Sequence, residues 1–337
     1  MLTISKDNST LIKGIVIIMM VFLHLFNGNH TELCTNLLFI GDVPFAKWLS
    51  NACGPVDFFL LLSGYGLAYT YDHKGISFMQ QAKRIVKLYI HYWNVLLIFV
   101  SIGCFMYAER YPGDWYTLVI NVIGWKTSYN GEMWFLFPYG FICLFSPWLF
   151  YVMCRIGYIK ALMITALIHV LTCYLISRYG TTFLYGNQLV YMPILILHLL
   201  YAFTVGTVFY QYRNRFKSCI SSRVAIVSII FVVAFVAFID SAAVYMLYVP
   251  LMVFLFCQIS YPKWIVVVLM ELGKKSMPIW MIHTWYCYYL FQSQIYSLKY
   301  PILILGGLIL ISYLTAIPVM WSAKKLFYII KIDNEKA

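Results

Sequence analysis

Charged residues are scarce in this chain. Asp, Glu, Lys and Arg together make up 11% of its 337 residues, whereas about 25% is typical of soluble domains. Hydrophobic residues make up 63%, against about 45–50% in an average soluble domain. A soluble globular protein is therefore excluded, because a core can absorb only part of that surplus. Disorder is excluded as well, since disordered chains are polar and charged.

Cysteine is also sparse. The nine cysteines are scattered, mostly within apolar stretches, and the sequence contains no CxxC motif and no Cys/His spacing typical of a metal site. We therefore expect no disulfide scaffold and no bound metal. Cys34 and Cys53 both fall on the predicted outer side of the membrane, and the sequence leaves open whether they form a disulfide.

Long apolar runs make up most of the sequence. A spanning helix needs roughly 20 mostly apolar residues, about twice the length of a barrel strand, so these runs predict helices whose backbone groups bond internally. We predict an all-α fold, a polytopic transmembrane helical bundle of about ten spans. The predicted spans are 11–27, 52–70, 88–107, 134–153, 158–177, 189–210, 224–239, 243–260, 276–292 and 301–322.

The basic residues are distributed unevenly between the two sides of this bundle. With ten spans and a cytoplasmic N-terminus, 19 of the 24 Lys and Arg residues lie on the cytoplasmic side, as the positive-inside rule requires. We therefore expect both termini in the cytoplasm, and we attribute the net charge of +12 to membrane orientation. The basic residues on the other side are Lys47, Arg110, Lys126, Arg178 and Lys299.

The connections between the spans are short. The longest, 108–133, contains an apolar stretch from Tyr111 to Trp125 that we expect to form an interfacial helix. No hydrophilic domain is attached at either end, and the first apolar run lacks a cleavage signal. We therefore expect a single membrane-embedded domain over residues 1–337, with no extra soluble domain, in the cell (inner or plasma) membrane.

Two polar residues mark the first predicted span. Lys13 and His24 are eleven positions apart, so they share one face of a helix and lie ~16 Å apart along it. At that distance they cannot act as acid and base on each other, but they could hold two ends of one long ligand. The alternative is a snorkelling lysine and a histidine bonded to a neighbouring helix.

An aspartate, Asp57, opens the second predicted span from the outer side. Antiparallel packing of the first two spans would bring it near His24, where a carboxylate fixes the tautomer of the imidazole and raises its basicity. The following Ser63 and Gly64 permit close helix approach. The alternative is an aspartate that is favoured only by the helix macrodipole.

A basic face begins the third predicted span. Arg84, Lys87 and His91 follow i, i+3, i+7 spacing and therefore line one side of a helix at its cytoplasmic end. Such a face suits a phosphorylated cytosolic ligand. Ordinary positive-inside anchoring would give the same pattern.

Three further residues fall in or beside later spans. Glu132 and Trp134 stand at the outer end of the fourth span, and His283 falls near the middle of the ninth, where a polar group is costly. His169 and His198 also lie in spans, but nothing polar surrounds them in the sequence. We expect both to be satisfied core histidines.

Taken in order, these pieces resemble the acyltransferase-3 family of integral membrane O-acyltransferases, over about residues 9–320. Lysine stands at positions 13 and 87, where arginine is commoner in the family. Lysine keeps the positive charge but cannot form the paired hydrogen bonds of a guanidinium group. The matching residues are Lys13 and His24, Asp57 with Ser63 and Gly64, Arg84 and Lys87, Trp134-Phe135-Leu136, and Gly273, Ser276 and His283.

The resemblance implies transfer of an acyl group, usually acetyl, from acyl-CoA to a hydroxyl, most often on a surface carbohydrate. His24 would be the general base, which contributes typically 10²–10⁴-fold, or would accept the acyl group itself, with Asp57 orienting it. No permanently bound cofactor is implied, since acyl-CoA is a substrate. CoA would be held by Lys13, Arg84, Lys87 and His91, and the acceptor path would be lined by Glu132, Trp134 and His283.

A polytopic transporter or flippase for lipid-linked sugars is the alternative function, because it would also have ten spans and polar groups near the midplane. It predicts paired charges along a continuous lumen and no dependence on acyl-CoA. For the acyltransferase, the expected partners are acyl-CoA, a surface glycan or other hydroxyl acceptor, and the lipid bilayer, without nucleic acid.

Overall fold

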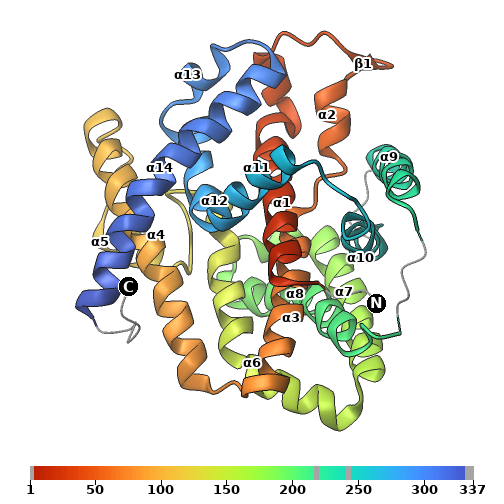
Figure 1. Cartoon of the computed structure of the whole chain (residues 1–337). Coiled ribbons are helices and arrows are strands. Elements are labelled where there is room, and N and C mark those ends of the chain that lie inside the picture. Colours follow the sequence, from red (N-terminus) through yellow and green to blue (C-terminus); the bar gives the residue numbers. More distant parts are fainter. Residues whose placement is uncertain (1–3, 216–219, 240–243, 331–337) are drawn as a thin grey trace. The chain divides into compact units, whose positions relative to one another are not determined.

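The computed structural model describes residues 4–215, 220–239 and 244–330, which form two compact units (Figure 1). Three lysines counted above on the cytoplasmic side, Lys217, Lys331 and Lys336, lie outside the described residues. Unit 1 comprises Met1–Val16, Asn51–Phe78 and Pro138–Gly273, and unit 2 comprises Ile17–Ser50, Met79–Phe137 and Lys274–Ala337.

Helix α1, Lys6–Phe26, belongs to both units. Its apolar run has no side chain that competes for the backbone hydrogen bonds, and in a bilayer those bonds must be made within the helix. Asp7 in the first turn suits the helix macrodipole, and His24 lies in the last turn. The helix therefore contributes Lys13 to unit 1 and His24 to unit 2.

Unit 1 is built mainly from helices. Helix α3 packs against α8, and α8 packs against α7 (Figure 1). The elements are α3 (Pro55–Lys74), α6 (Leu136–Ile156), α7 (Tyr158–Tyr179) with a π-helical turn (Gly180–Leu184), α8 (Gln188–Gln211), α9 (Ser222–Ile239), α10 (Tyr245–Phe256) and α11 (Lys263–Lys274).

Glycines set the closest helix contact of unit 1. A Cβ on Gly64 of α3 would lie 2.0 Å from the Phe203 carbonyl oxygen of α8, and a Cβ on Gly206 of α8 would lie 1.9 Å from the Leu61 oxygen of α3. The two glycines are therefore reciprocal, and each lets the opposite backbone approach, as small residues do between membrane helices. This agrees with the close approach expected from Gly64.

Unit 2 combines long helices with several short segments. Helices α12 and α14 pack together, and α13 contacts α14. Besides the end of α1, its elements are the 3₁₀ segments Gly28–Leu33 and Gly131–Phe135, β1 (Phe39–Ile40), β2 (Val43–Pro44), α2 (Phe45–Ser50), α4 (Phe78–Met106), α5 (Trp115–Val122), α12 (Ser276–Thr284), the π-helical turn Trp285–Tyr289, α13 (Gln292–Tyr296) and α14 (Pro301–Ile329).

The helix expected between Tyr111 and Trp125 is present as α5. Asp114 caps its N-terminus, because the Thr117 N–H donates to Asp114 Oδ1 at 2.7 Å. Hydrogen bonds from Thr117 hold the pKa of the Asp114 carboxyl below its usual value. Trp115 is largely exposed.

The all-helical fold class is confirmed, apart from the two-residue strands β1 and β2, which pair antiparallel. Every predicted span contains a helix. Among the described residues, seven helices are long and apolar enough to cross a membrane, and α3, α10 and α12 are not among them. The count of ten spans and the cytoplasmic termini therefore stay predictions. The seven spans are Lys6–Phe26, Phe78–Met106, Gly131–Ile156, Tyr158–Leu184, Gln188–Gln211, Ser222–Ile239 and Pro301–Ile329.

Two local details differ from or add to the sequence interpretation. Helix α11 lies where we expected only a connection, because twelve residues with charges at both ends are too short to read as a span. Cys34 and Cys53 are both free thiols. Burial raises the pKa of the Cys34 thiol to about 11, so this thiol stays protonated and unreactive near neutral pH.

Candidate functional site

Two histidines of unit 2 are hydrogen bonded to each other. His24 Nδ1, in the last turn of α1, lies 2.7 Å from His283 Nε2 in α12. The ring centres are 4.9 Å apart. His283 is fully buried, whereas His24 keeps part of its surface exposed. The pair therefore has a fully buried member and a partly exposed member.

The hydrogen bonds around this pair determine where its protons lie. His283 Nδ1 lies 3.0 Å from the Ile279 oxygen and 2.9 Å from the Trp280 oxygen. Carbonyl oxygens only accept, so Nδ1 of His283 carries the proton and its Nε2 has the lone pair. His24 Nδ1 must then donate to His283 Nε2. In the neutral pair, His24 Nε2 consequently keeps a free lone pair, which is the requirement for a base or a nucleophile.

Tyrosines hold the end of α1 that carries His24. The last carbonyl groups of a helix have no partner within it. Here the Tyr288 hydroxyl donates to the His24 carbonyl oxygen, and the Tyr296 hydroxyl donates to the Leu25 oxygen at 2.8 Å. Tyr288 also stacks on His30, with ring centres 4.7 Å apart. The backbone of His24 is thus anchored to the segment that follows His283.

Glu132 lies in a second polar cluster of unit 2. The Tyr289 hydroxyl donates to Glu132 Oε2 at 2.7 Å and accepts from the Gly131 N–H at 2.7 Å. The Arg110 guanidinium lies over the Tyr289 ring, 4.9 Å from its centre. Trp134, close to Glu132 in the chain, is 37% exposed. The cluster therefore combines a carboxylate, a cation and an accessible indole.

Asn130 connects this cluster to the helix that carries His283. In the orientation that satisfies its amide, Asn130 donates to Glu132 Oε2 at 3.2 Å and accepts from Trp285 Nε1 at 3.1 Å. The Thr284 hydroxyl also bonds to the Asn130 oxygen. Thr284 and Trp285 directly follow His283. The amide of Asn130 therefore links Glu132 to the two residues that follow His283.

Along α4, the basic residues Arg84 and Lys87 are followed by His91 and Asn94, and we call these four residues the polar strip. Arg84 is exposed and Lys87 is half-buried, with its Nζ 5.6 Å from the centre of the Phe327 ring. His91 is buried, and its Nδ1 and Asn94 Nδ2 have no hydrogen-bond partner among the described residues. Unpaired buried polar atoms are costly, so the strip has the composition of a site whose ligand supplies the missing bonds.

Further along the same helix, α4 contacts the segment next to His283. The Phe99 ring stacks on Trp285, with centres 5.3 Å apart and planes 12° from parallel. Arg84 and Phe99 are fifteen positions apart, or ~23 Å along the helix axis. Helix α4 therefore runs from the basic end to the neighbourhood of the histidine pair within one unit.

Two of the predicted site residues belong to unit 1. Lys13 lies next to Gly14, whose added Cβ would meet the Leu269 oxygen of α11 at 2.1 Å, so α1 and α11 are in backbone contact there. Asp57, in the first turn of α3, lines a small cavity together with His169 and Tyr201.

The structure thus brings His24, Arg84, Lys87, His91, Glu132, Trp134 and His283 into unit 2 and places Lys13 and Asp57 in unit 1. The sequence pattern did not indicate that His283 bonds to His24, and it did not single out Asn94, Asn130, Tyr288 or Tyr289. Asn94 could have been found, because it extends the Arg84, Lys87, His91 face by one further helical step. The tyrosines had no such signal in a chain with 29 of them.

A model of a protein family, described as an acyltransferase domain, matches residues 7–321. This range covers both units. No curated protein and no solved structure is detectably similar to the chain.

Proposed function

The chain belongs to the acyltransferase-3 family and is an integral, multi-pass membrane acyltransferase, and from that premise we propose that it moves an acetyl group from acetyl-CoA to a hydroxyl of a cell-surface carbohydrate. The observation that carries the proposal is the bond of His24 Nδ1 to His283 Nε2 at 2.7 Å. It leaves His24 Nε2 as a base, which a sugar hydroxyl needs before it can attack a thioester.

The proposed reaction uses that lone pair twice. His24 Nε2 takes the proton of the acceptor hydroxyl while the hydroxyl oxygen bonds to the thioester carbonyl carbon. The tetrahedral adduct then breaks its carbon–sulfur bond, and the departing CoA sulfur receives the proton from His24. Alternatively, the same lone pair attacks the thioester and His24 carries the acyl group to the acceptor. In both routes, His283 positions the ring of His24.

The donor is proposed to bind along α4. Arg84 and Lys87 supply positive charge for the CoA phosphates, for which charge-assisted hydrogen bonds are strong. The unpaired His91 Nδ1 and Asn94 Nδ2 lie beyond them and suit the amide groups of the pantetheine arm, which have both donors and acceptors. The arm would point along the ~23 Å of helix that leads to Phe99.

The acceptor is proposed to approach from the side of Glu132 and Trp134. An exposed indole offers an apolar face on which a sugar ring can pack, and Glu132 accepts hydrogen bonds from sugar hydroxyls. A connection from Glu132 through Asn130 to Thr284 would couple acceptor binding to the helix that holds His283.

The roles of Lys13 in phosphate binding and of Asp57 in orienting His24 stay predictions. Within unit 2, the imidazole of His283 already bonds the His24 nitrogen that a carboxylate would occupy. We therefore assign the positioning role to His283.

The test is acyl transfer by the full-length protein in proteoliposomes, measured as release of the CoA thiol from acetyl-CoA in the presence of a surface-glycan extract. We expect His24→Ala to lower kcat by on the order of 10²–10⁴-fold, the usual contribution of a general base. Arg84→Ala should instead raise the KM for acetyl-CoA by about tenfold, a loss of about 1.4 kcal/mol, which is in the range of one hydrogen bond to a charged group.

His73→Ala is the matched control, because His73 is exposed and lies in unit 1. Mass spectrometry of the glycan should show the added acetyl group with the wild-type protein and with His73→Ala. Full transfer by His24→Ala at normal expression would contradict the assigned base, and an unchanged KM in Arg84→Ala would contradict the donor site.

A further inference from the structure

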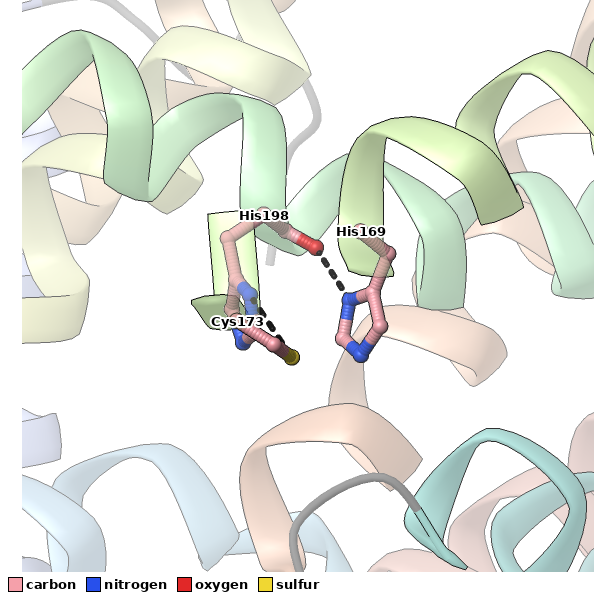
Figure 2. Close-up of side chains that lie close together, drawn as sticks. All are labelled: His169, Cys173 and His198. Atoms are coloured by element: carbon pink, nitrogen blue, oxygen red, sulfur yellow. Dashed lines mark hydrogen bonds between the residues drawn. The ribbon is translucent and has the colours of Figure 1, made fainter. Parts of the chain in front are cut away.

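Unit 1 contains a second cluster of nitrogen and sulfur side chains, which the proposed reaction does not use. His169 and Cys173 come from α7 and His198 comes from α8 (Figure 2). Each offers one possible ligand atom, and these atoms all lie within 4.8 Å of one another. His169 and Cys173 are four positions apart, so they share a helix face. Figure 2 shows the sulfur of Cys173 beside the rings of both histidines.

Hydrogen bonds orient both imidazoles in the same way. His169 Nδ1 donates to the His198 carbonyl oxygen at 2.9 Å. The Thr172 hydroxyl donates its proton to the His169 oxygen at 2.9 Å, so its oxygen accepts from His198 Nδ1 at 3.2 Å. The Cys173 sulfur also lies 3.8 Å from His198 Nδ1. With Nδ1 donating to an oxygen in both rings, each ring carries its proton on Nδ1 and its lone pair on Nε2. A metal-binding histidine is oriented in this manner, with its other nitrogen donating to an oxygen.

A carboxylate lies close to this cluster. Asp57 lines the same small cavity as His169 and Tyr201, and His169 belongs to the cluster. Within the described residues, no hydrogen-bond or ion-pair partner of the Asp57 carboxylate is found. A carboxylate withdrawn from water is stable only when it is protonated, paired with a positive charge or bound to a metal.

We propose that His169, Cys173 and His198 form a binding site for a divalent transition-metal cation of the zinc type, with Asp57 completing the charge balance. Two imidazoles and a thiolate are ligands that zinc prefers. A thiolate and a carboxylate together neutralise a divalent cation, which removes the cost of burying any one of these charges alone. Binding releases the Cys173 proton, because the thiolate is the ligand.

The site closes by side-chain rotation. Tetrahedral zinc bonds of about 2.0–2.1 Å to nitrogen and about 2.3 Å to sulfur place ligand atoms roughly 3.3–3.6 Å apart. The stacked rings of His169 and His198, with centres 4.3 Å apart, must therefore turn until both Nε2 atoms point at one position. A metal ion bound in this way links α7 to α8 through His169, Cys173 and His198.

Metal content of the full-length protein in detergent tests this site without any activity measurement. The protein is stripped with a chelator, dialysed against zinc chloride and then against metal-free buffer, and analysed by mass spectrometry of the elements. We expect one zinc per chain. With cobalt in place of zinc, we expect the near-ultraviolet charge-transfer absorption of a cobalt–thiolate bond.

Cys173→Ser should abolish the cobalt–thiolate absorption and lower zinc retention at least tenfold. Cys257→Ser, a change of another free thiol in unit 1, should leave both unchanged. Wild-type protein that retains no zinc, or that binds cobalt without thiolate absorption, would overturn the proposal. If Cys173→Ser does not fold, the cobalt spectrum of the wild type decides the question by itself.

Discussion

Each unit of this protein contains a pair of neighbouring histidines, and the two pairs are bonded differently. In unit 2, a ring nitrogen of His24 bonds directly to a ring nitrogen of His283. In unit 1, the rings of His169 and His198 stack, and each Nδ1 bonds to an oxygen instead. The first pair has one free lone pair in total, whereas the second has two, with a thiol beside them.

The difference shows that the hydrogen bonds of an imidazole determine which of its ring nitrogens keeps a free lone pair, and therefore which chemistry the ring suits. In unit 2, one histidine uses both nitrogens in fixed bonds, so its only role is to hold the other, which is then suited to proton transfer. In unit 1, both histidines keep a lone pair on Nε2, and after the rings turn these two nitrogens could share one cation. On the two proposals above, the same residue type would support acid–base chemistry in one unit and ligand chemistry in the other.

Among the changes that test the comparison of the two pairs, the largest expected effect separates the positioning role of His283 from a merely structural one. His283→Leu removes the acceptor for His24 Nδ1, and we expect kcat for acyl transfer to fall on the order of 10²-fold, the lower end of a general-base contribution. His283→Gln should recover most of this loss, because its side-chain oxygen can accept the same hydrogen bond.

The KM for acetyl-CoA is the control measurement for both variants, and it should stay at the wild-type value because neither touches the donor site. Equal losses in the leucine and glutamine variants would show that His283 serves packing alone.

The next effect concerns the orientation of the unit 1 pair. Thr172→Val removes the oxygen that accepts from His198 Nδ1, and we expect the cobalt or zinc dissociation constant to rise by about 10–100-fold, as is usual when a partner of a metal ligand is removed. Competition with a chelator of known affinity measures it. Thr165→Val is the matched control, since the Thr165 hydroxyl bonds only to carbonyls of its own helix. Equal metal affinities in the two variants would contradict the assigned role of Thr172 in orienting His198.

The smallest expected effect tests the helix contact that supports the unit 1 pair. Gly64→Ala places a methyl group against the Phe203 oxygen of α8, and overpacking of this kind costs about 1–3 kcal/mol. Gly66→Ala, two positions away, meets nothing within 4 Å and should be neutral or slightly stabilising, because alanine is the better helix former. The midpoint of thermal unfolding in detergent compares them, and similar midpoints would contradict the assigned role of Gly64.

Much of the helical architecture could be predicted because lipid leaves few alternatives to a hydrogen-bonded helix. Each predicted span contains a helix, and Gly64 was correctly associated with close packing. Helix α11 was missed because a short amphipathic helix resembles a connection in sequence. The tyrosines that anchor His24 could not be chosen from the many others, since only their hydroxyl geometry distinguishes them.

The order and spacing of Lys13, His24, Arg84, Lys87 and His283 were sufficient to identify the family, because motif order is a one-dimensional property that no folding is needed to read. The hydrophobic runs likewise determined an all-helical membrane protein. Only the tertiary structure decided that His283 bonds to His24, and that His169, taken from sequence as a satisfied core residue, lies beside Cys173 and His198. The first pairing joins helices that are distant in the chain, and the second depends on how the side chains are oriented. Local periodicity in the sequence encodes neither property.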